Sequence, residues 1–409
     1  MAERGFYVGI DIDDTYAVAS FYEDGIKEPA TVSMTAGSEV FQIPVQITKK
    51  KGMGQWFIGE EAARVQKEQE AIVIDKLLSR ALNQEEILID GEGYHAEDLL
   101  VLFLKKLIGY VGGPYGAVKV ETLAFCVERL DATLSKLLLR IGERLEVKKE
   151  QLVLLDRKSA FYYFTLNQQK ELWLHDVYLF DYRETAVKCI RLERNLNTIP
   201  QLITFEEQVV ELSDENRDEA FYQLLTKLMT GHIVSSVYLV GDGFDGGWMK
   251  LSLAYLCRGR RAFVGKNLYA KGACYATMVI KGGMPWPYAY IGDNEMKVNV
   301  SLAVKNRGKK EFLTLLSAGD NWYEASGECE VILDDTNEIA IWLQLPDSKT
   351  ANVEKLTLSD LPERENKTTR LRISAKPLSD RQVKIEMKDL GFGEIAKCKE
   401  QHWEYIMSV

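Results

Sequence analysis

A short polar segment near the N-terminus carries side chains that could bind a metal ion or accept hydrogen bonds. These side chains are Asp11, Asp13, Asp14 and Thr15. Two apolar runs, residues 6–12 and 17–21, lie on either side of the segment. Carboxylate oxygens are the ligands that hard divalent cations prefer, and hydroxyl groups both donate and accept hydrogen bonds. The pattern predicts a β-hairpin that presents these groups at its tip.

A second stretch repeats the spacing of the first one. In both stretches an aspartate is followed by three residues, a threonine and an apolar run, and the second aspartate and threonine are Asp181 and Thr185. A second hairpin is therefore predicted over residues 177–192. Two similar hairpins so far apart in one chain predict two related lobes.

A third candidate is a glycine-rich turn. The apolar run 237–240 is followed by Gly241, Asp242 and Gly243, and a helix is predicted from residue 248. A glycine-rich turn between a strand and a helix lets backbone amides approach an anionic ligand such as a phosphate. The alternative is a tight turn without a ligand, since glycine serves that purpose as well.

The composition excludes several classes of protein. A chain of 409 residues with 46% hydrophobic and 27% charged residues is typical of two or three globular domains. The net charge of −10 argues against a nucleic-acid-binding protein. No apolar run reaches the roughly 18 residues of a membrane span, and the six cysteines form no Cys-x-x-Cys pair. We therefore expect a cytoplasmic protein with free thiols and no membrane insertion.

The pattern of predicted elements changes along the chain. Strands and amphipathic helices alternate in the first part, which indicates an α/β fold; the predicted helices include 60–69, 72–82, 97–111, 132–145, 214–230 and 268–280. The segment 281–287 contains two glycines and two prolines and predicts a boundary. Seven alternating polar and apolar runs follow, which predicts a β-sandwich: 297–304, 311–316, 328–333, 339–345, 352–358, 368–375 and 382–387.

These motifs together resemble the actin and heat-shock chaperone ATPase superfamily, and in particular the DnaK-like seventy-kilodalton chaperones. Residues 9–15 and 181–185 resemble its two phosphate hairpins, and residues 240–243 resemble its adenosine loop. Residues 156–164 and 270–276 resemble its two connecting helices. The resemblance implies a two-lobed actin-like (ribonuclease H-like) nucleotide-binding domain over 1–284, with lobes at about 1–170 and 171–284 and the second lobe reduced. It also implies a substrate-binding-like β-sandwich over 285–409.

The resemblance also assigns roles to individual residues. It implies ATP or ADP with Mg²⁺ as the cofactor and ATP hydrolysis as the reaction. The implied catalytic residues are Asp11, Lys76, Asp156 and Asp181, of which Asp11 and Asp181 would hold the metal. The implied nucleotide contacts are Asp13, Asp14, Thr15, Thr185, Gly241, Asp242 and Gly243.

The departures from the family pattern concern the phosphate loops. Asp13 and Asp14 stand where the family has glycine and threonine, and residues 182–184 replace a glycine run. Each additional carboxylate within ~5 Å of a triphosphate costs about 3 kcal/mol at an effective dielectric constant near 20. No stretch after residue 387 is long enough for the family's helical lid. These differences predict a divergent DnaK-like protein without a lid, which binds ATP weakly or not at all. Its β-sandwich is predicted to bind a protein or an extended peptide in a groove. The tail 397–409 of the same chain is a candidate to fill that groove.

Two alternatives use the same residues. The spacing of Asp11, Asp13 and Thr15 after a strand, with Asp242 and Asp245 after another, also resembles the magnesium-dependent phosphatases of the haloacid dehalogenase type. In that case Asp11 would be the nucleophile, Asp13 the general acid and base, and Asp242 or Asp245 a magnesium ligand. The second alternative is an actin-like filament or scaffold protein.

Overall fold

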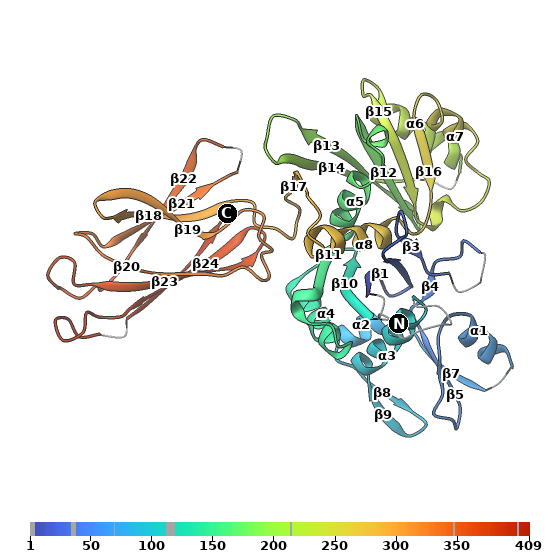
Figure 1. The fold of residues 1–409 in the computed structure, drawn as a ribbon, viewed down its shortest axis with the longest axis horizontal. Coiled ribbons are helices and arrows are strands. Elements are labelled where there is room, and N and C mark those ends of the chain that lie inside the picture. The colour runs from blue at the N-terminus through green and yellow to red at the C-terminus, as the bar shows by residue number, and fades with distance from the viewer. Residues whose placement is uncertain are drawn as a thin grey trace. The chain divides into compact units, whose positions relative to one another are not determined.

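The computed structural model describes residues 5–33, 38–68, 70–111, 119–212, 215–346, 348–398 and 401–409. The chain is mixed α/β and divides into two compact units (Figure 1). One unit comprises residues 1–196 and 201–288, and the other comprises 197–200 and 289–409. Every helix formed by the described residues belongs to the first unit. None of these helices is long and apolar enough to cross a membrane.

The first sheet of the first unit contains the predicted N-terminal hairpin. Its strand order is β11-β10-β1-β2-β3, and β4 also pairs with β2. Strands β1 and β2 are antiparallel, which confirms the hairpin, whereas β1, β10 and β11 run parallel. The strands are β1 (Gly5–Ile12), β2 (Tyr16–Tyr22), β3 (Ala30–Thr31), β4 (Ile43–Pro44), β10 (Lys119–Val127) and β11 (Leu152–Asp156).

The second sheet repeats this arrangement. Five of its strands follow the order β16-β15-β12-β13-β14, and β12 and β13 form the predicted second hairpin. In both sheets a third antiparallel strand pairs with the second hairpin strand, and two parallel strands follow the first hairpin strand. The two hairpins therefore occupy equivalent positions. The strands are β12 (Asp176–Arg183), β13 (Ala186–Asn195), β14 (Gln201–Glu211), β15 (Val234–Val240) and β16 (Arg261–Val264).

Most of the predicted helices of the first unit are present. The helices are α1 (Gly59–Glu68), α2 (Leu77–Leu82), α3 (Ala96–Gly109), α4 (Ala132–Arg144), α5 (Arg157–Leu166), α6 (Arg217–Met229), α7 (Leu251–Leu256) and α8 (Leu268–Ile280). The helix predicted from residue 248 begins at Leu251, and residue 214, the predicted start of α6, lies outside the described residues.

The helix predicted over 72–82 is wrong in its first half. Residues Ala71–Ile74 form strand β7, which pairs with β5 (Ile47–Lys50), and α2 begins only at Leu77. Ile72, Val73 and Ile74 are all β-branched, and such a run favours a strand. The remaining strands of this unit are β6 (Trp56–Phe57), β8 (Glu86–Ile89) and β9 (Glu92–His95). The short strand β17 (Tyr288–Tyr290) begins at the last residue of the unit.

Helices α5 and α8 pack at very short distance. A Cβ atom at Gly272 of α8 would lie 2.0 Å from the carbonyl oxygen of Ala160 in α5, so only glycine fits there. A Cβ atom at Gly9 of β1 would lie 2.3 Å from the backbone nitrogen of Cys274. The small residue Gly272 thus allows α8 to pack closely against α5. The contact fixes the first residues of α5 and α8, which carry Arg157 and Tyr269, beside the end of β1.

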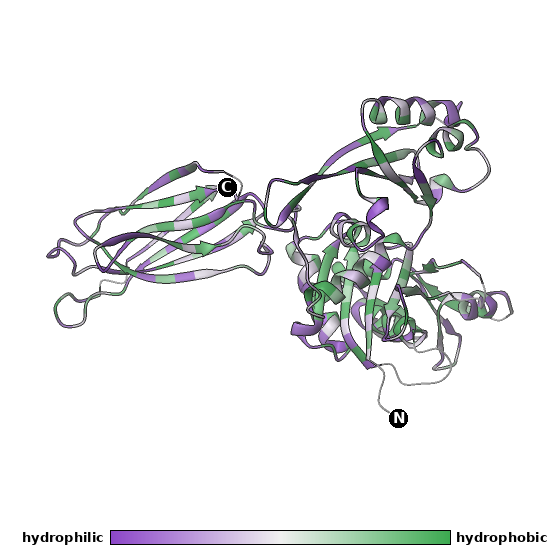
Figure 2. Cartoon of the chain, turned by 45° about the horizontal axis from the view of Figure 1, so that its top comes forward, coloured by the Kyte–Doolittle hydropathy of each residue, from purple (hydrophilic) through white to green (hydrophobic). Residues whose placement is uncertain are grey.

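The second unit consists of two four-stranded antiparallel sheets, β19-β18-β21-β22 and β20-β23-β24-β25. All seven predicted strands are present. They are β18 (Asn299–Asn306), β19 (Lys309–Leu316), β20 (Gly327–Ile332), β21 (Glu338–Gln344), β22 (Ala351–Thr357), β23 (Arg370–Ser379) and β24 (Gln382–Asp389). Residues from both sheets contribute to one hydrophobic core, including Leu302, Ile341, Ile373 and Ile385. Hydrophobic and hydrophilic residues alternate along these strands (Figure 2).

The C-terminal tail is part of this unit. Residues His402–Ser408 form β25, which pairs with β24 along its whole length. Trp403 and Met407 are each only 7% exposed and belong to the core, and the Trp403 indole N–H donates to the carbonyl of Ser359 at 2.8 Å. The tail is therefore an edge strand of a sheet.

Candidate functional site

Four of the residues selected from the sequence line one small cavity. They are Asp11, Asp13, Gly241 and Asp242, from strand ends and turns of the first and second sheets. The other polar residues of the lining are Tyr16, Gln42, Arg157, Arg183, Lys266 and Tyr269. The cavity has a volume of about 30 Å³. That volume holds about one water molecule, whereas sites for organic ligands occupy roughly 300–1,000 Å³.

Arg157 holds the predicted metal ligand Asp11. Asp11 is the last residue but one of the central strand β1, and Arg157 is the first residue of α5. The Arg157 Nε lies 2.9 Å from Asp11 Oδ1, and Nη2 lies 3.3 Å from Oδ2, with both side chains at most 10% exposed. Burial raises the pKa of the Asp11 carboxyl, and the Arg157 guanidinium opposes that rise. Both carboxylate oxygens of Asp11 thus already accept hydrogen bonds.

Asp13 connects the two hairpins. Its Oδ1 accepts hydrogen bonds from the backbone N–H groups of Thr15 and Tyr16, at 2.8 and 2.9 Å, which shapes the turn. Its Oδ2 accepts from Arg157 Nη2 at 2.9 Å and from Arg183 Nη1 at 3.1 Å. Burial by itself would raise the pKa of the Asp13 carboxyl, but these backbone and guanidinium donors lower it below its usual value.

Asp181 ties the second hairpin to helix α8. Its Oδ1 accepts from Arg183 Nε at 2.9 Å, and its Oδ2 accepts from the Tyr269 hydroxyl at 2.8 Å. Burial, with the Asp181 charge, raises the pKa of the Tyr269 phenol well above its usual value, so the hydroxyl stays protonated and donates. The Arg157 guanidinium lies 5.3 Å from the centre of the Tyr269 ring. We call these six residues the Asp–Arg network: Asp11, Asp13, Asp181, Arg157, Arg183 and Tyr269.

The network does not fit a magnesium nucleotide as it stands. The oxygens of Asp11 and Asp181 that would hold the cation accept hydrogen bonds from guanidinium or phenol groups. The cavity beside them is about the size of one water molecule. A nucleotide would therefore require that the ion pairs of Arg157 and Arg183 open first.

The phosphatase alternative needs Asp11 as a nucleophile and Asp242 or Asp245 as a magnesium ligand. A nucleophilic Asp11 needs an oxygen that can attack phosphorus. In this arrangement both of its oxygens are engaged by Arg157. Asp242 and Asp245 each pair with Lys266, at 2.9 and 2.6 Å.

Close packing explains why glycine stands at two positions of the glycine-rich turn. Gly241 has a φ of +96°, and a Cβ atom there would lie 2.3 Å from the carbonyl oxygen of Tyr182. A Cβ atom at Gly243 would lie 2.3 Å from Cγ of the fully buried Tyr182 ring. The packing of Tyr182 accounts for both glycines without a ligand, as the tight-turn alternative requires.

Asp242 lies at the rim of the cavity. It accepts hydrogen bonds from Lys266 at 2.9 Å and from the Gln42 amide at 3.2 Å. Although burial opposes the shift, these donors lower the pKa of the Asp242 carboxyl below its usual value. Gln42 follows the first hairpin in the chain, so this contact also links the two sheets.

Two predicted acidic residues cap helices outside the cavity. Asp156 is the N-cap of α5 and accepts a hydrogen bond from the Ser159 backbone N–H at 2.6 Å. Asp14 accepts from the backbone N–H of Ser79 in α2 at 2.8 Å and pairs with the Ser79 hydroxyl. Both side chains stabilise first turns of helices. These hydrogen bonds give both side chains a structural role, and the catalytic role of Asp156 and the nucleotide contact of Asp14 stay predictions.

Three other predicted residues lie away from the cavity. Lys76 is exposed at the N-cap of α2 with a φ of 51°. Thr15 and Thr185 are exposed in the turns of the two hairpins, and the Thr185 carbonyl accepts from the Leu212 N–H at 2.8 Å. None of the three lines the cavity.

The sequence analysis missed Arg157, Lys266 and Tyr269 as members of the site. Arg157 directly follows Asp156 in the segment 156–164 that resembles a connecting helix, and that position is the signal that could have indicated it. Tyr269 and Lys266 become neighbours of the hairpins only through the packing of α8. Arg183 belongs to the segment 182–184 that stands in place of the family's glycine run, and it bridges Asp13 and Asp181.

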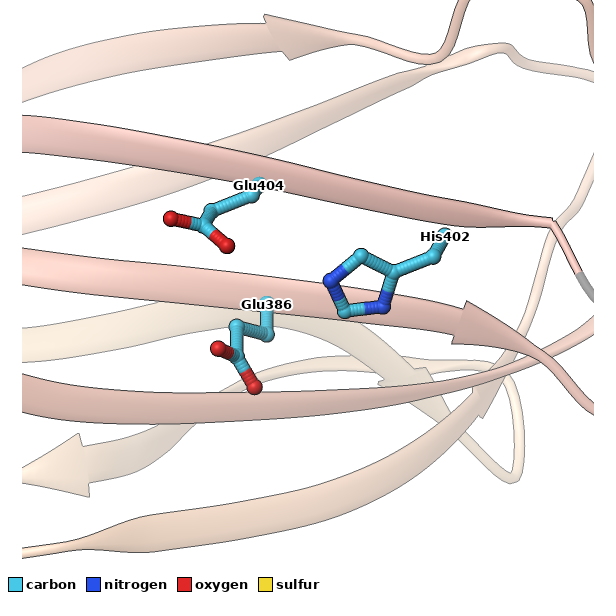
Figure 3. Close-up of side chains that lie close together, drawn as sticks. All are labelled: Glu386, His402 and Glu404. Atoms are coloured by element: carbon cyan, nitrogen blue, oxygen red, sulfur yellow. The ribbon is translucent and has the colours of Figure 1, made fainter.

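A second cluster of charged side chains lies on the second unit. Glu386, His402 and Glu404 lie close together on β24 and β25, and their ligand atoms are within 4.8 Å of one another (Figure 3). Glu386 and Glu404 are directly opposite each other across the strands. Lys384 Nζ lies 2.5 Å from one of these carboxylates and 2.9 Å from the other. Because this ammonium offsets the like charges, the cluster is explained without a metal ion.

Comparison with known families gives two matches. A model described as a family of unknown function (DUF5716), C-terminal, matches residues 28–293. A model described as a domain of unknown function (DUF8552) matches residues 295–409. The junction of the two matches lies a few residues after the division between the two units at 288–289. No curated protein matches the chain.

Proposed function

The chain belongs to the family of unknown function (DUF5716), C-terminal, and we propose that it is a divergent relative of the actin and heat-shock chaperone ATPases that binds a protein or extended peptide. In this proposal its nucleotide site is closed, and ATP binding and turnover are weak or lost. The repeated strand order of the two sheets supports the two-lobed actin-like domain. The shared core of the two antiparallel sheets supports the β-sandwich.

The observation that carries the proposal is the Asp–Arg network. Arg157 and Arg183 engage all three aspartates that a magnesium nucleotide would need. Breaking a buried ion pair leaves an uncompensated charge and costs about 3–5 kcal/mol. Since about 1.4 kcal/mol corresponds to a factor of ten, opening the network reduces nucleotide affinity by roughly a hundredfold or more. A closed nucleotide site supports the proposal that the protein acts by binding a partner and not by hydrolysing ATP.

Calorimetric titration of the full chain with ATP and ADP, each with Mg²⁺, tests the closed site. We expect no saturable binding tighter than about 100 µM, or roughly −5.5 kcal/mol. Lys76→Ala is the matched control, because Lys76 is exposed and lies outside the cavity. Binding in the low micromolar range that Asp11→Asn abolishes, together with release of inorganic phosphate, would overturn the proposal.

The binding function needs its own test. A library of extended peptides on a solid support, probed with the full chain, measures whether any class of peptide is bound. The proposal expects a subset of peptides to bind with micromolar affinity, about −8 kcal/mol, and with no dependence on nucleotide. A library without any bound peptide contradicts the binding function while leaving the closed site untouched.

A further inference from the structure

Strand β19 is an edge strand with an unusual pattern of exposure. In the described part of the second unit it forms a ladder with β18 alone (Figure 1). Its first six residues, 309–314, are all exposed, so side chains on both faces of the strand reach solvent. A strand edge with free backbone groups can pair with an added strand, and natural proteins usually protect such edges.

The exposed face of this sheet carries an aromatic pair beside the edge. Phe312 of β19 is 55% exposed, and its ring centre lies 4.9 Å from that of Trp342 on β21. Lys310 Nζ lies 5.4 Å from the Trp342 ring. The Trp342 indole N–H has no acceptor among the described residues. On the other face of the same strand, Leu313 is 39% exposed. Apolar side chains on both faces of an edge are a surface that a partner would cover.

The adjoining turn concentrates positive charge. Four cations lie within residues 305–310: Lys305, Arg307, Lys309 and Lys310. Lys305 lies 3.5 Å from Asp334. For Arg307, Lys309 and Lys310, no carboxylate of the described chain lies within ion-pair distance. In a chain whose net charge is −10, this local excess of positive charge favours an acidic partner.

We propose that the β19 edge binds, as an additional strand, an extended peptide in which consecutive acidic residues adjoin consecutive apolar residues. Its main chain pairs with β19. Since Lys309 and Lys310 point to opposite faces of the strand, as do Phe312 and Leu313, two consecutive acidic side chains approach the lysines and two consecutive apolar side chains cover Phe312 and Leu313. The inference rests on the proposed binding function and assigns the surface and the chemical class of the partner.

Other occupants fit these observations less well. A nucleic acid would use the cations but neither the free strand edge nor Leu313. A second copy of this chain would bring two positively charged β18–β19 turns together, and like charges repel. The protein's own tail is already placed, because β25 pairs with β24 in the other sheet.

The test is fluorescence anisotropy of labelled probes with the full chain. The probes are a ten-residue peptide of five glutamates followed by five valines, the same peptide with lysine in place of glutamate, and a single-stranded oligothymidylate of ten nucleotides. We expect the acidic peptide to bind at least tenfold more tightly than the other two probes. Its affinity falls as the salt concentration is raised from 50 to 500 mM, because exposed charges are screened.

Variants locate the site. Phe312→Ser, and Lys309→Ala combined with Lys310→Ala, should each weaken binding of the acidic peptide tenfold or more. Ile332→Ser is the matched control, since Ile332 is 50% exposed on β20, an edge strand of the other sheet. The affinity of this variant for the acidic peptide should equal that of the wild type. Thermal melting curves establish that each variant is folded.

Three results would overturn the inference. The first is equal affinity of the Phe312→Ser variant and the wild type for the acidic peptide. The second is tighter binding of the oligothymidylate than of the acidic peptide. The third is a concentration-dependent dimer that Phe312→Ser abolishes. If library peptides bind but are insensitive to Phe312→Ser, the inference fails and the proposed binding function stands.

Discussion

In the first unit, three aspartates and two arginines compensate one another around a cavity of about 30 Å³. In the second unit, the cations of the β18–β19 turn stand exposed beside an aromatic pair. Buried charges must be paired to be stable, and pairing leaves them unavailable to a ligand. Exposed charges without partners cost little and remain available. The difference agrees with the proposals that the Asp–Arg network contributes to stability and that a partner binds on the second unit.

The largest expected effect is that of Arg157→Ala. The substitution leaves the buried Asp11 without its bidentate partner, so we expect the free energy of unfolding to fall by about 3–5 kcal/mol. Urea denaturation followed by far-UV circular dichroism measures the change. The double variant Asp11→Asn with Arg157→Met removes both charges and should recover much of the loss. Equal stability of Arg157→Ala and wild type would mean that the network does not support the fold.

Gly243→Ala should have the next largest effect. The added methyl group would lie 2.3 Å from the Tyr182 ring, and overpacking of a core costs about 1–3 kcal/mol. Gly247→Ala in the same loop is a matched control, because nothing lies within 4 Å of a Cβ atom there. Denaturation midpoints of the two variants are compared. If Gly243→Ala is tolerated as well as the control, the glycine is not explained by packing.

Arg183→Ala and Lys310→Ala compare the two regions directly. Arg183 pairs with Asp13 and Asp181 but is 42% exposed, so its loss should cost about 1 kcal/mol or less. Lys310 has no carboxylate partner among the described residues and lies over Trp342, so its loss should change stability by less than about 0.5 kcal/mol. The two denaturation midpoints test this order. A larger loss for Lys310→Ala would reverse the roles assigned to the two regions.

The smallest expected effect is the pH dependence of the unfolding free energy that comes from Asp13. The pKa of the Asp13 carboxyl is lower in the folded protein than in the unfolded chain, where it is about 3.9. Its stabilising contribution is therefore complete above that value and is lost as the pH falls through the folded pKa. The difference in unfolding free energy between wild type and Asp13→Asn should shrink as the pH is lowered from 5 towards 3. A difference that stays constant over this range would contradict the assignment.

Local patterns were sufficient to predict most of the elements. Both hairpins, α3, α8 and the seven strands of the second unit follow from periodicity and turn residues. The segment 72–82 shows the limit, because its β-branched first half pairs with β5, a partner that local periodicity does not reveal. The same limit explains why β14 and β16 were not predicted.

The candidate site was predicted in part. The sequence by itself determined that Asp11, Asp13 and Asp181 lie at hairpin ends, because the spacing of the two hairpins repeats. It did not determine which charges meet. Arg157 reaches Asp11 because α5 begins at the end of β11 and packs on α8, and Tyr269 reaches Asp181 because α8 begins beside the second hairpin. These contacts join residues from 88 to 146 positions apart, so only the tertiary structure decided that the aspartates are paired with arginines.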